Sequence, residues 1–353
     1  MFFQPRTDHI GLDISDHSFK AVQLKKGLRG SLKLVGVGNI NIAEGTFNDG
    51  DLKQPDSFIK AVNDLIAKPT WGKFTSNLIV ACLPESKTFI KMIDIPVLTN
   101  AEVEQAVKWE AEHHIPLPFE ETYWDWQKIE LAPNIIPNRQ PVILAVSPKN
   151  IVDSYSQALS RAHLTCVAME IEAQAIVRSL IPTNSRGEKN ATIIIDIGAD
   201  HTSLIMFSLN TIQFTVSLPI SGNLITKTIA QTLNLEETLA EEAKIKYGLD
   251  SQVHHGAIYK ILQDMITDLI HRLRESLTFY SEHFPHNPPV GEILLCGGAA
   301  NCKSIDKLIQ AELKIPVKLG NPWSNITPSP NQLSAAESLS YTTAIGLALR
   351  GLI

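Results

Sequence analysis

Alternating apolar and polar positions give the chain two similar halves. Residues 9–45 alternate in this way and are punctuated by glycines, which predicts a three-stranded antiparallel meander. The stretch 191–219 repeats the pattern. In each stretch an aspartate stands at a strand end before a short polar turn, Asp13 in the first and Asp196 in the second. Turn amides and a carboxylate suit phosphate and a hydrated cation, so the two units predict a duplicated clamp that closes on one phosphate chain.

Helical spacing follows each meander. Apolar side chains in 56–67 recur every three or four residues, and Asp56 is the expected N-cap. Thr99 and Glu102 match a capping box that opens a helix ending at His114. The same patterns predict strands at 78–83, 142–146, 164–169, 293–296 and 317–319, helices at 149–161, 172–180, 222–233, 256–284 and 304–313, and a last helix ending at Arg350.

Two lobes are expected, because 353 residues are many for one core. A polar loop at 182–190 marks their boundary. Aromatic residues and prolines are dense between the strand at 78–83 and the strand at 142–146, which indicates an inserted subdomain. The predicted α/β organisation is lobe one at 1–188, with core 1–83 and 142–188 and insertion 84–141, and lobe two at 189–353, with core 189–222 and 290–353 and helical subdomain 223–289.

Composition narrows the class of protein. The net charge of −6 and the lack of a basic block argue against a nucleic-acid surface. The four cysteines form no C-x-x-C pair, so buried free thiols in a reducing compartment are expected. Every apolar run is interrupted before it reaches membrane-spanning length, and the N-terminus lacks the apolar core of a signal peptide. We therefore expect a cytoplasmic protein.

Several motifs in a fixed order resemble the actin and heat-shock chaperone ATPase superfamily. After the second meander come the loop at 221–226, the helical pair Glu241 and Lys244, the strand and glycine turn at 293–299, and a closing helix at 341–349. The resemblance covers essentially the whole chain. It implies a two-lobed actin-like fold, that is, a duplicated ribonuclease H-like fold.

The insertion resembles that of FtsA and, more closely, that of the PilM family of type IV pilus assembly proteins. FIKMIDIP at 89–96, IPLPFEE at 115–121 and MEIE at 169–172 carry this likeness. FtsA-like proteins have an amphipathic tail after the closing helix, and none is expected after Ile353.

The resemblance implies bound ATP and Mg²⁺. Asp13 and Asp196 are expected to flank the metal, mainly through water, and Lys20 to add a positive charge. Ser15 stands where the family commonly has glycine, so phosphate approach is expected to differ there. The implied nucleotide-binding residues are Asp13, Ser15, His17, Ser18, Lys20, Asp196, Gly198, Ala199, His201, Thr202, Gly222, Glu241, Lys244, Gly297, Gly298 and Ala299.

Ordinary structural explanations compete at each position. Either aspartate alone merely ends a strand, and Glu241 with Lys244 is also a surface ion pair. Gly297 and Gly298 also fit a plain β-to-α turn. Glu172 is a candidate weak base for hydrolysis, although the helix dipole explains an acid there equally well. No second acid is identified beside it.

The function implied is an ATP-binding platform for pilus biogenesis with at most weak ATPase activity. Its expected partners are the N-terminal peptide of a PilN-type inner-membrane protein, docked between the insertion and lobe one, and the pilus motor ATPase complex. Trp109, Phe119 and Trp126 are candidate groove residues. Membrane contact is expected only through partners, at the cytoplasmic face of the inner membrane, and self-association is left open. The alternatives are an FtsA-like division filament and a small-molecule kinase of the same superfamily.

Overall fold

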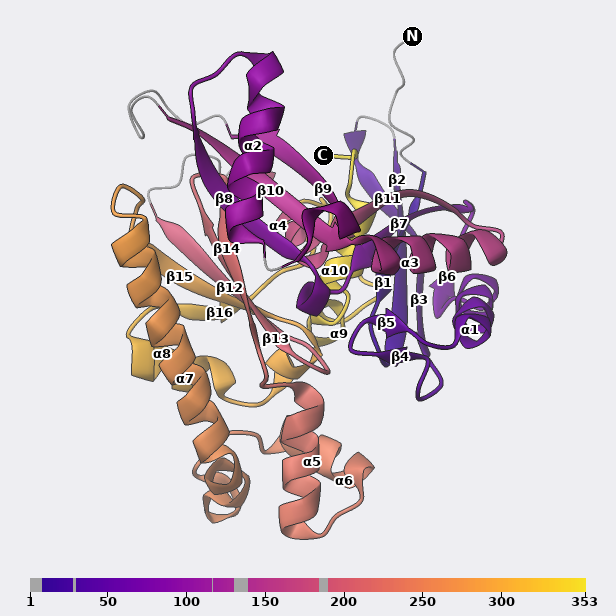
Figure 1. The fold of residues 1–353 in the computed structure, drawn as a ribbon. Coiled ribbons are helices and arrows are strands. Elements are labelled where there is room, and N and C mark those ends of the chain that lie inside the picture. The colour runs from indigo at the N-terminus through magenta and orange to yellow at the C-terminus, as the bar shows by residue number, and fades with distance from the viewer. Residues whose placement is uncertain (1–7, 28–29, 116, 130–138, 184–189) are drawn as a thin grey trace.

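The computed structural model describes residues 8–27, 30–115, 117–129, 139–183 and 190–353, which form two lobes that are each built on a β-sheet (Figure 1). The first sheet has six strands in the order β11-β7-β1-β2-β3-β6. Its meander is antiparallel as predicted, and β7 and β11 extend it in parallel with β1. The strands are β1 (Ile10–Ile14), β2 (Ser18–Lys26), β3 (Leu32–Asn41), β6 (Trp71–Gly72), β7 (Leu78–Leu83) and β11 (Thr165–Ile171), with a separate hairpin of β4 (Phe47–Asn48) and β5 (Asp51–Leu52).

The second sheet has eight strands in the order β16-β15-β12-β13-β14-β8-β10-β9. The strands of lobe two are β12 (Ala191–Ile197), β13 (Thr202–Ser208), β14 (Thr211–Leu218), β15 (Val290–Cys296) and β16 (Val317–Leu319). The others come from the insertion: β8 (Phe89–Pro96), β9 (Thr122–Lys128) and β10 (Arg139–Pro148). The insertion therefore continues the sheet of lobe two, and the join is the pairing of Lys91 on β8 with Phe214 on β14.

This topology corrects one prediction. The strand expected at 142–146 does form, but it does not return to the sheet of lobe one. As part of β10 it pairs along its whole length with β8 on one side and β9 on the other. Its alternating pattern indicates a half-buried strand, but it does not indicate which sheet the strand joins.

The helices agree closely with their predicted spans. They are α1 (Pro55–Ala67), α2 (Asn100–His114), α3 (Lys149–Arg161), α4 (Glu172–Leu180), α5 (Gly222–Leu233), α6 (Glu237–Lys246), α7 (Ala257–His283), α8 (Ile305–Leu313), α9 (Ala335–Leu339) and α10 (Thr342–Ala348), with short 3₁₀ turns η2 (Glu85–Lys87), η3 (Phe119–Glu121), η5 (Val253–Gly256) and η6 (Gly298–Asn301). The capping box of Thr99 and Glu102 is present. The N-cap prediction for Asp56 is wrong, because Pro55 already begins the helix and Gln54 is the N-cap. Proline suits a first helical position, so the N-cap lies two residues closer to the N-terminus than predicted.

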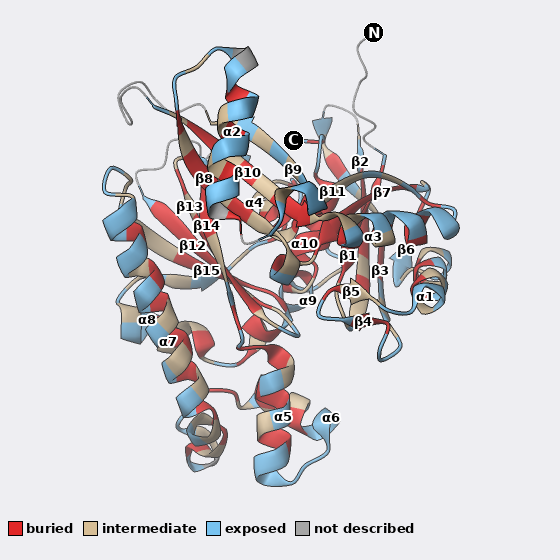
Figure 2. Cartoon of the chain, viewed as in Figure 1, coloured by how far each residue is buried: buried red, intermediate tan, exposed pale blue. Residues whose placement is uncertain are grey.

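Helix α10 lies between the two lobes and is buried along its whole length (Figure 2). It contacts α4 and β1 so closely that side chains are excluded at the crossings. A Cβ atom on Gly346 would lie 1.8 Å from the carbonyl oxygen of Ala175, and one on Gly11 would lie 2.4 Å from that of Ala344. The glycines thus let three backbones meet below the site described next. In the described part of the chain, no helix combines the length and apolar content that crossing a bilayer requires.

Candidate functional site

The two acidic turns face each other between the lobes. Asp13 and Asp196 are each the last residue but one of their strands, β1 and β12, and a turn follows each strand. His17 in the first turn contacts Asp200 in the second, with 2.5 Å between Nε2 and Oδ1. The expectation that the two turns meet is confirmed. The site these turns enclose is called the inter-lobe site below.

Each of the two aspartates has a thiol partner on the neighbouring parallel strand. Cys82 Sγ on β7 lies 3.5 Å from Asp13 Oδ1, and Cys296 on β15 hydrogen-bonds Asp196 in the same way. Burial raises the pKa of both thiols well above the usual range, so they stay protonated and donate. Each lobe therefore has an equivalent thiol donor beside its aspartate.

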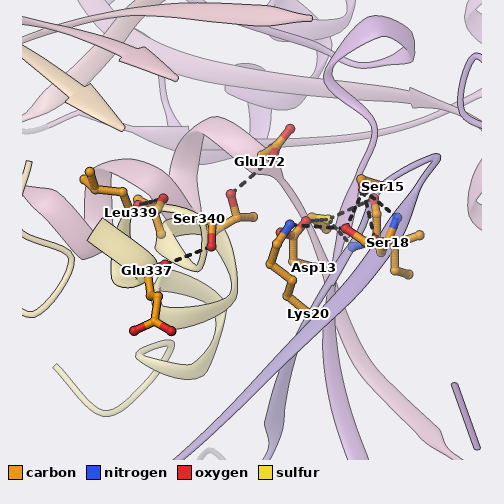
Figure 3. Close-up of polar contacts among 12 residues, drawn as sticks. Asp13, Ser15, Ser18, Lys20, Glu172, Glu337, Leu339 and Ser340 are labelled. Atoms are coloured by element: carbon orange, nitrogen blue, oxygen red, sulfur yellow. Dashed lines mark hydrogen bonds and ion pairs between the residues drawn. The ribbon is translucent and has the colours of Figure 1, made fainter. Parts of the chain in front are cut away.

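Burial also changes the acidity of the two aspartates. It raises the pKa of Asp196 to about 6, although His201 favours the charged form. It raises the pKa of Asp13 as well, against the opposing effect of Lys20, whose Nζ lies 3.9 Å from Asp13 Oδ2 (Figure 3). Buried carboxylates repel one another, and a bound cation offsets this repulsion.

The first turn is closed by its own hydroxyl groups. Ser15 Oγ donates to the Ser18 carbonyl at 2.9 Å and accepts from the Ser18 amide at 3.2 Å (Figure 3). The Ser15 amide also donates to the Ser18 carbonyl. Two of the amides expected to hold phosphate, those of Ser15 and Ser18, are therefore engaged within the turn. Serine in place of glycine thus changes the donor set, while Lys20 Nζ remains near, 3.3 Å from Ser18 Oγ.

The second turn is held against the start of α5. The Gly222 amide donates to the Gly198 carbonyl at 2.9 Å, and the Asn223 amide donates to that of Ala199 at 3.0 Å. Thr202 Oγ1 donates to the Ile220 carbonyl at 2.7 Å. These bonds bring Gly198, Ala199 and Thr202 together with Gly222.

Glu241 and Lys244, two of the residues expected to bind nucleotide, lie close to Gly222. Lys244 is buried, and its Nζ lies 2.6 Å from Glu241 Oε2 and 3.2 Å from the Gly222 carbonyl. A Cβ atom on Gly222 would lie 3.1 Å from that of Ala299. The glycine turn at 297–299 therefore adjoins this pair. The buried lysine shows that Glu241 and Lys244 are more than a solvated surface pair.

Gly297 leaves room for the carboxylate of Asp196. Its φ of +84° lies in a region that favours glycine, and a Cβ atom there would lie 2.2 Å from Asp196 Oδ1. Gly298 is open by contrast, because the nearest atom to its added Cβ is that of Ser340 at 3.9 Å.

Glu172 begins α4 beside the second turn. Its Oε1 accepts from Thr343 at 3.2 Å, and its Oε2 lies 4.0 Å from His201 Nε2. Burial, and then the charges of Asp13 and Asp196, raise the pKa of Glu172 well above its usual value. The raised pKa means that Glu172 holds its proton more tightly than an ordinary glutamate does.

A further acid, Glu85, also lies at this site, and the sequence analysis missed it. Its charge raises the pKa of Glu172, and the charge of Asp196 raises its own. The expectation of no second acid beside Glu172 is therefore wrong. The available signal was position: Glu85 follows β7, which is parallel to β1, and parallel strands bring their carboxyl ends to one edge.

The donor chemistry fits a hydrated magnesium ion. Hard carboxylate oxygens are the ligands that Mg²⁺ prefers, and it keeps several of its waters. Within the described ranges, no three His, Cys, Asp or Glu side chains are placed to hold a metal together. Contact through water is the arrangement compatible with this spacing.

Comparison with known proteins places this geometry in a family. The chain is similar to the solved "PilM-PilN type IV pilus biogenesis complex", with 24% identity, a TM-score of 0.83, and coverage of 99% of this chain and 100% of that one. It also resembles MreB 5 of Spiroplasma citri bound to AMPPNP, with 15% identity, a TM-score of 0.52 and coverage of 96% and 94%. Both likenesses show the actin-like fold.

Curated relatives of this chain are cell division proteins. The cell division protein FtsA of Enterococcus hirae is 24% identical over 89% of this chain and 78% of its own length. FtsA of Buchnera aphidicola is 27% identical over 45% of this chain, and the match spans only 44% of that relative. The model of the family described as "Type IV pilus assembly protein PilM" matches residues 11–352. The chain therefore belongs to the PilM family of type IV pilus assembly proteins.

Proposed function

We propose that this chain is an ATP-binding platform of type IV pilus assembly that docks the N-terminal peptide of a PilN-type inner-membrane protein. The observation that carries the nucleotide half is the contact between the two acidic turns, with Asp13 buried and Asp196 partly buried behind them. Bound Mg²⁺ supplies charge neutralisation for the phosphates. Asp13 and Asp196 orient its waters, and Lys244 and Glu241 hold the nucleoside end.

A groove supports the peptide half. It has a volume of about 2220 Å³ and lies between the insertion and lobe one. One wall is β9, the last strand of the eight-stranded sheet, and the other is β11, the last strand of the six-stranded sheet. An edge strand offers unpaired backbone groups to an extended peptide.

The two walls differ in regularity. The ladder between β11 and β7 has a bulge between Cys166 and Ala168, which leaves Val167 outside the regular register. Bulges discourage strand addition, whereas the pairing of β9 with β10 is regular over seven residues. In our proposal the peptide therefore adds to β9, and Val167, 42% exposed, contacts its side chains from the opposite wall.

The candidate aromatic residues have different positions. Trp126 lines the groove, and so does Trp124. Phe119 does not line the groove; its ring lies tilted against that of Trp124, with centroids 5.1 Å apart, and it packs with both tryptophans against the core of the insertion. Trp109, 60% exposed, lies on α2 beside a separate hollow. Only Trp126 of the three is thus placed for the proposed peptide.

A groove substitution tests the peptide half. We expect Val167→Arg to weaken binding of a labelled PilN-type N-terminal peptide at least about tenfold, because it adds a charge to an apolar wall. Fluorescence polarisation measures the affinity. Val97→Arg is the matched control, since Val97 is exposed and does not line the groove. No peptide binding by the unmodified protein, or equal losses in both variants, would contradict the docking proposal.

Calorimetric titration with MgATP tests the nucleotide half, and absence of binding would refute it. Slow hydrolysis at most is expected. Through its partner the platform would lie at the cytoplasmic face of the inner membrane and contact the pilus motor complex. Filaments that sediment with ATP would instead favour the division-protein alternative, and ATP use that depends on an added sugar or carboxylate would favour a kinase.

A further inference from the structure

Glu85 has a buried carboxylate oxygen that the described protein does not satisfy. The residue begins η2, directly after β7 and Pro84, and is 5% exposed. Its carboxylate pairs with the hydroxyl of Thr215 on β14. Its Oε2 atom has no hydrogen-bond partner among the described residues.

Such an atom needs a donor from outside the protein. A carboxylate oxygen taken out of water without a hydrogen bond is strongly unfavourable, and charged groups are more costly than neutral ones. Nearby charges make the situation worse, because Asp196 and Glu172 lie close enough to interact with Glu85. Burial raises the pKa of Glu85, and interactions with Thr215 and His201 oppose this change. A cation, or water bound to a cation, would therefore supply the interaction that this oxygen lacks.

The place of Glu85 favours the hydrated metal over an isolated water. β7 carries Cys82, which donates to Asp13, and Glu85 stands three residues further along the same segment. Thr215 belongs to lobe two, so Glu85 touches both lobes, as the paired turns do. It occupies the edge at which the two aspartates converge.

We infer that Glu85 is a third carboxylate of the magnesium site, and that its free Oε2 accepts a hydrogen bond from a metal-bound water. The inference rests on the proposed function, since it requires that the nucleotide bind with Mg²⁺. Glu85 acts through that water and is a positioning residue for the cation. The spacing of the acidic side chains agrees with a contact of this indirect kind.

The test compares ATP binding by Glu85→Gln with Mg²⁺ and with EDTA. The full chain is titrated with ATP in a calorimeter under both conditions. We expect Glu85→Gln to weaken binding about tenfold in Mg²⁺ and to leave binding in EDTA unchanged, as for the loss of one hydrogen bond to a charged group. Mn²⁺ in place of Mg²⁺, followed by electron paramagnetic resonance, gives a second readout: the variant is expected to hold less bound Mn²⁺ at equal ATP occupancy.

Two controls separate this role from a structural one. Thr215→Val removes the protein partner of Glu85 but keeps its charge, so the dependence on Mg²⁺ is expected to remain. Glu242→Gln removes an exposed acid of α6 and is expected to change neither affinity. Should Glu85→Gln fold poorly, Glu85→Asp keeps the charge but withdraws the oxygen, and it is expected to show the same selective loss.

The outcomes are distinct. Equal weakening with and without Mg²⁺ makes Glu85 a structural residue and overturns the inference, as does an unchanged affinity. If the unmodified protein binds no ATP in Mg²⁺, the proposed nucleotide function fails first and the inference falls with it. If the unmodified protein binds ATP in a Mg²⁺-dependent way and Glu85→Gln binds it equally well, only the role of Glu85 is refuted.

Discussion

Asp196→Asn is expected to lose MgATP binding and to make the free protein more stable. The loss follows because an amide cannot replace the charge that orients the waters of the metal, and we expect at least a hundredfold weaker affinity in calorimetry. The gain follows from the raised pKa. A shift from 3.8 to about 6 means that the ionised Asp196 destabilises the fold by about 3 kcal/mol at neutral pH, at most.

The sign of this effect sets its pH dependence. Between pH 3.8 and about 6 the folded protein binds a proton at Asp196 that the unfolded chain has already released, so stability falls as pH rises through this window. Above about pH 6 the full cost is present. Urea unfolding of both proteins at pH 4 and pH 7.5 is expected to show the advantage of the asparagine variant at the higher pH only. An equal difference at both pH values would contradict the assignment.

Gly346→Ala is expected to destabilise the protein by about 3 kcal/mol or more. Helix propensity alone predicts the opposite, since alanine stabilises a helix interior by about 1 kcal/mol relative to glycine. The added Cβ would lie 1.8 Å from the carbonyl oxygen of Ala175, which belongs to backbone and cannot rotate away. Overpacking of this kind forces α10 away from α4.

Thermal unfolding measures this second effect. Gly298→Ala is the matched control, because the nearest atom to its new Cβ is 3.9 Å away. We expect its melting temperature to stay close to that of the unmodified protein, while Gly346→Ala melts well below it or fails to accumulate as folded protein. An increase in melting temperature for Gly346→Ala would mean that the crossing of α10 and α4 is looser than described.

Local patterns predicted local structure well. Thr99 and Glu102 satisfy each other within one turn of helix, so the start of α2 is readable from four residues. The two meanders are likewise contiguous in sequence, and with them the two strand-end aspartates could be found. Nucleotide binding by the predicted site residues stays a prediction.

Long-range pairing was beyond such patterns. The sheet that β10 joins depends on its pairing with β8 and β9. The alternating pattern of a strand does not indicate which strands it pairs with. Glu85 escaped notice for the same reason: a lone glutamate after a proline is unremarkable until the strand before it is known to lie beside β1. The bonds within the Ser15 turn also required coordinates, because a serine hydroxyl has several backbone groups within reach.

The way the insertion is attached has a mechanical consequence. One wall of the groove, β9, moves with lobe two through β10, β8 and the pairing of β8 with β14, whereas the other wall, β11, belongs to lobe one. A rotation of the lobes on nucleotide binding would therefore change the width of the groove. By thermodynamic reciprocity, the factor by which nucleotide changes peptide affinity equals the factor by which peptide changes nucleotide affinity. If both ligands bind as proposed, this attachment couples nucleotide binding between the lobes to peptide binding in the groove.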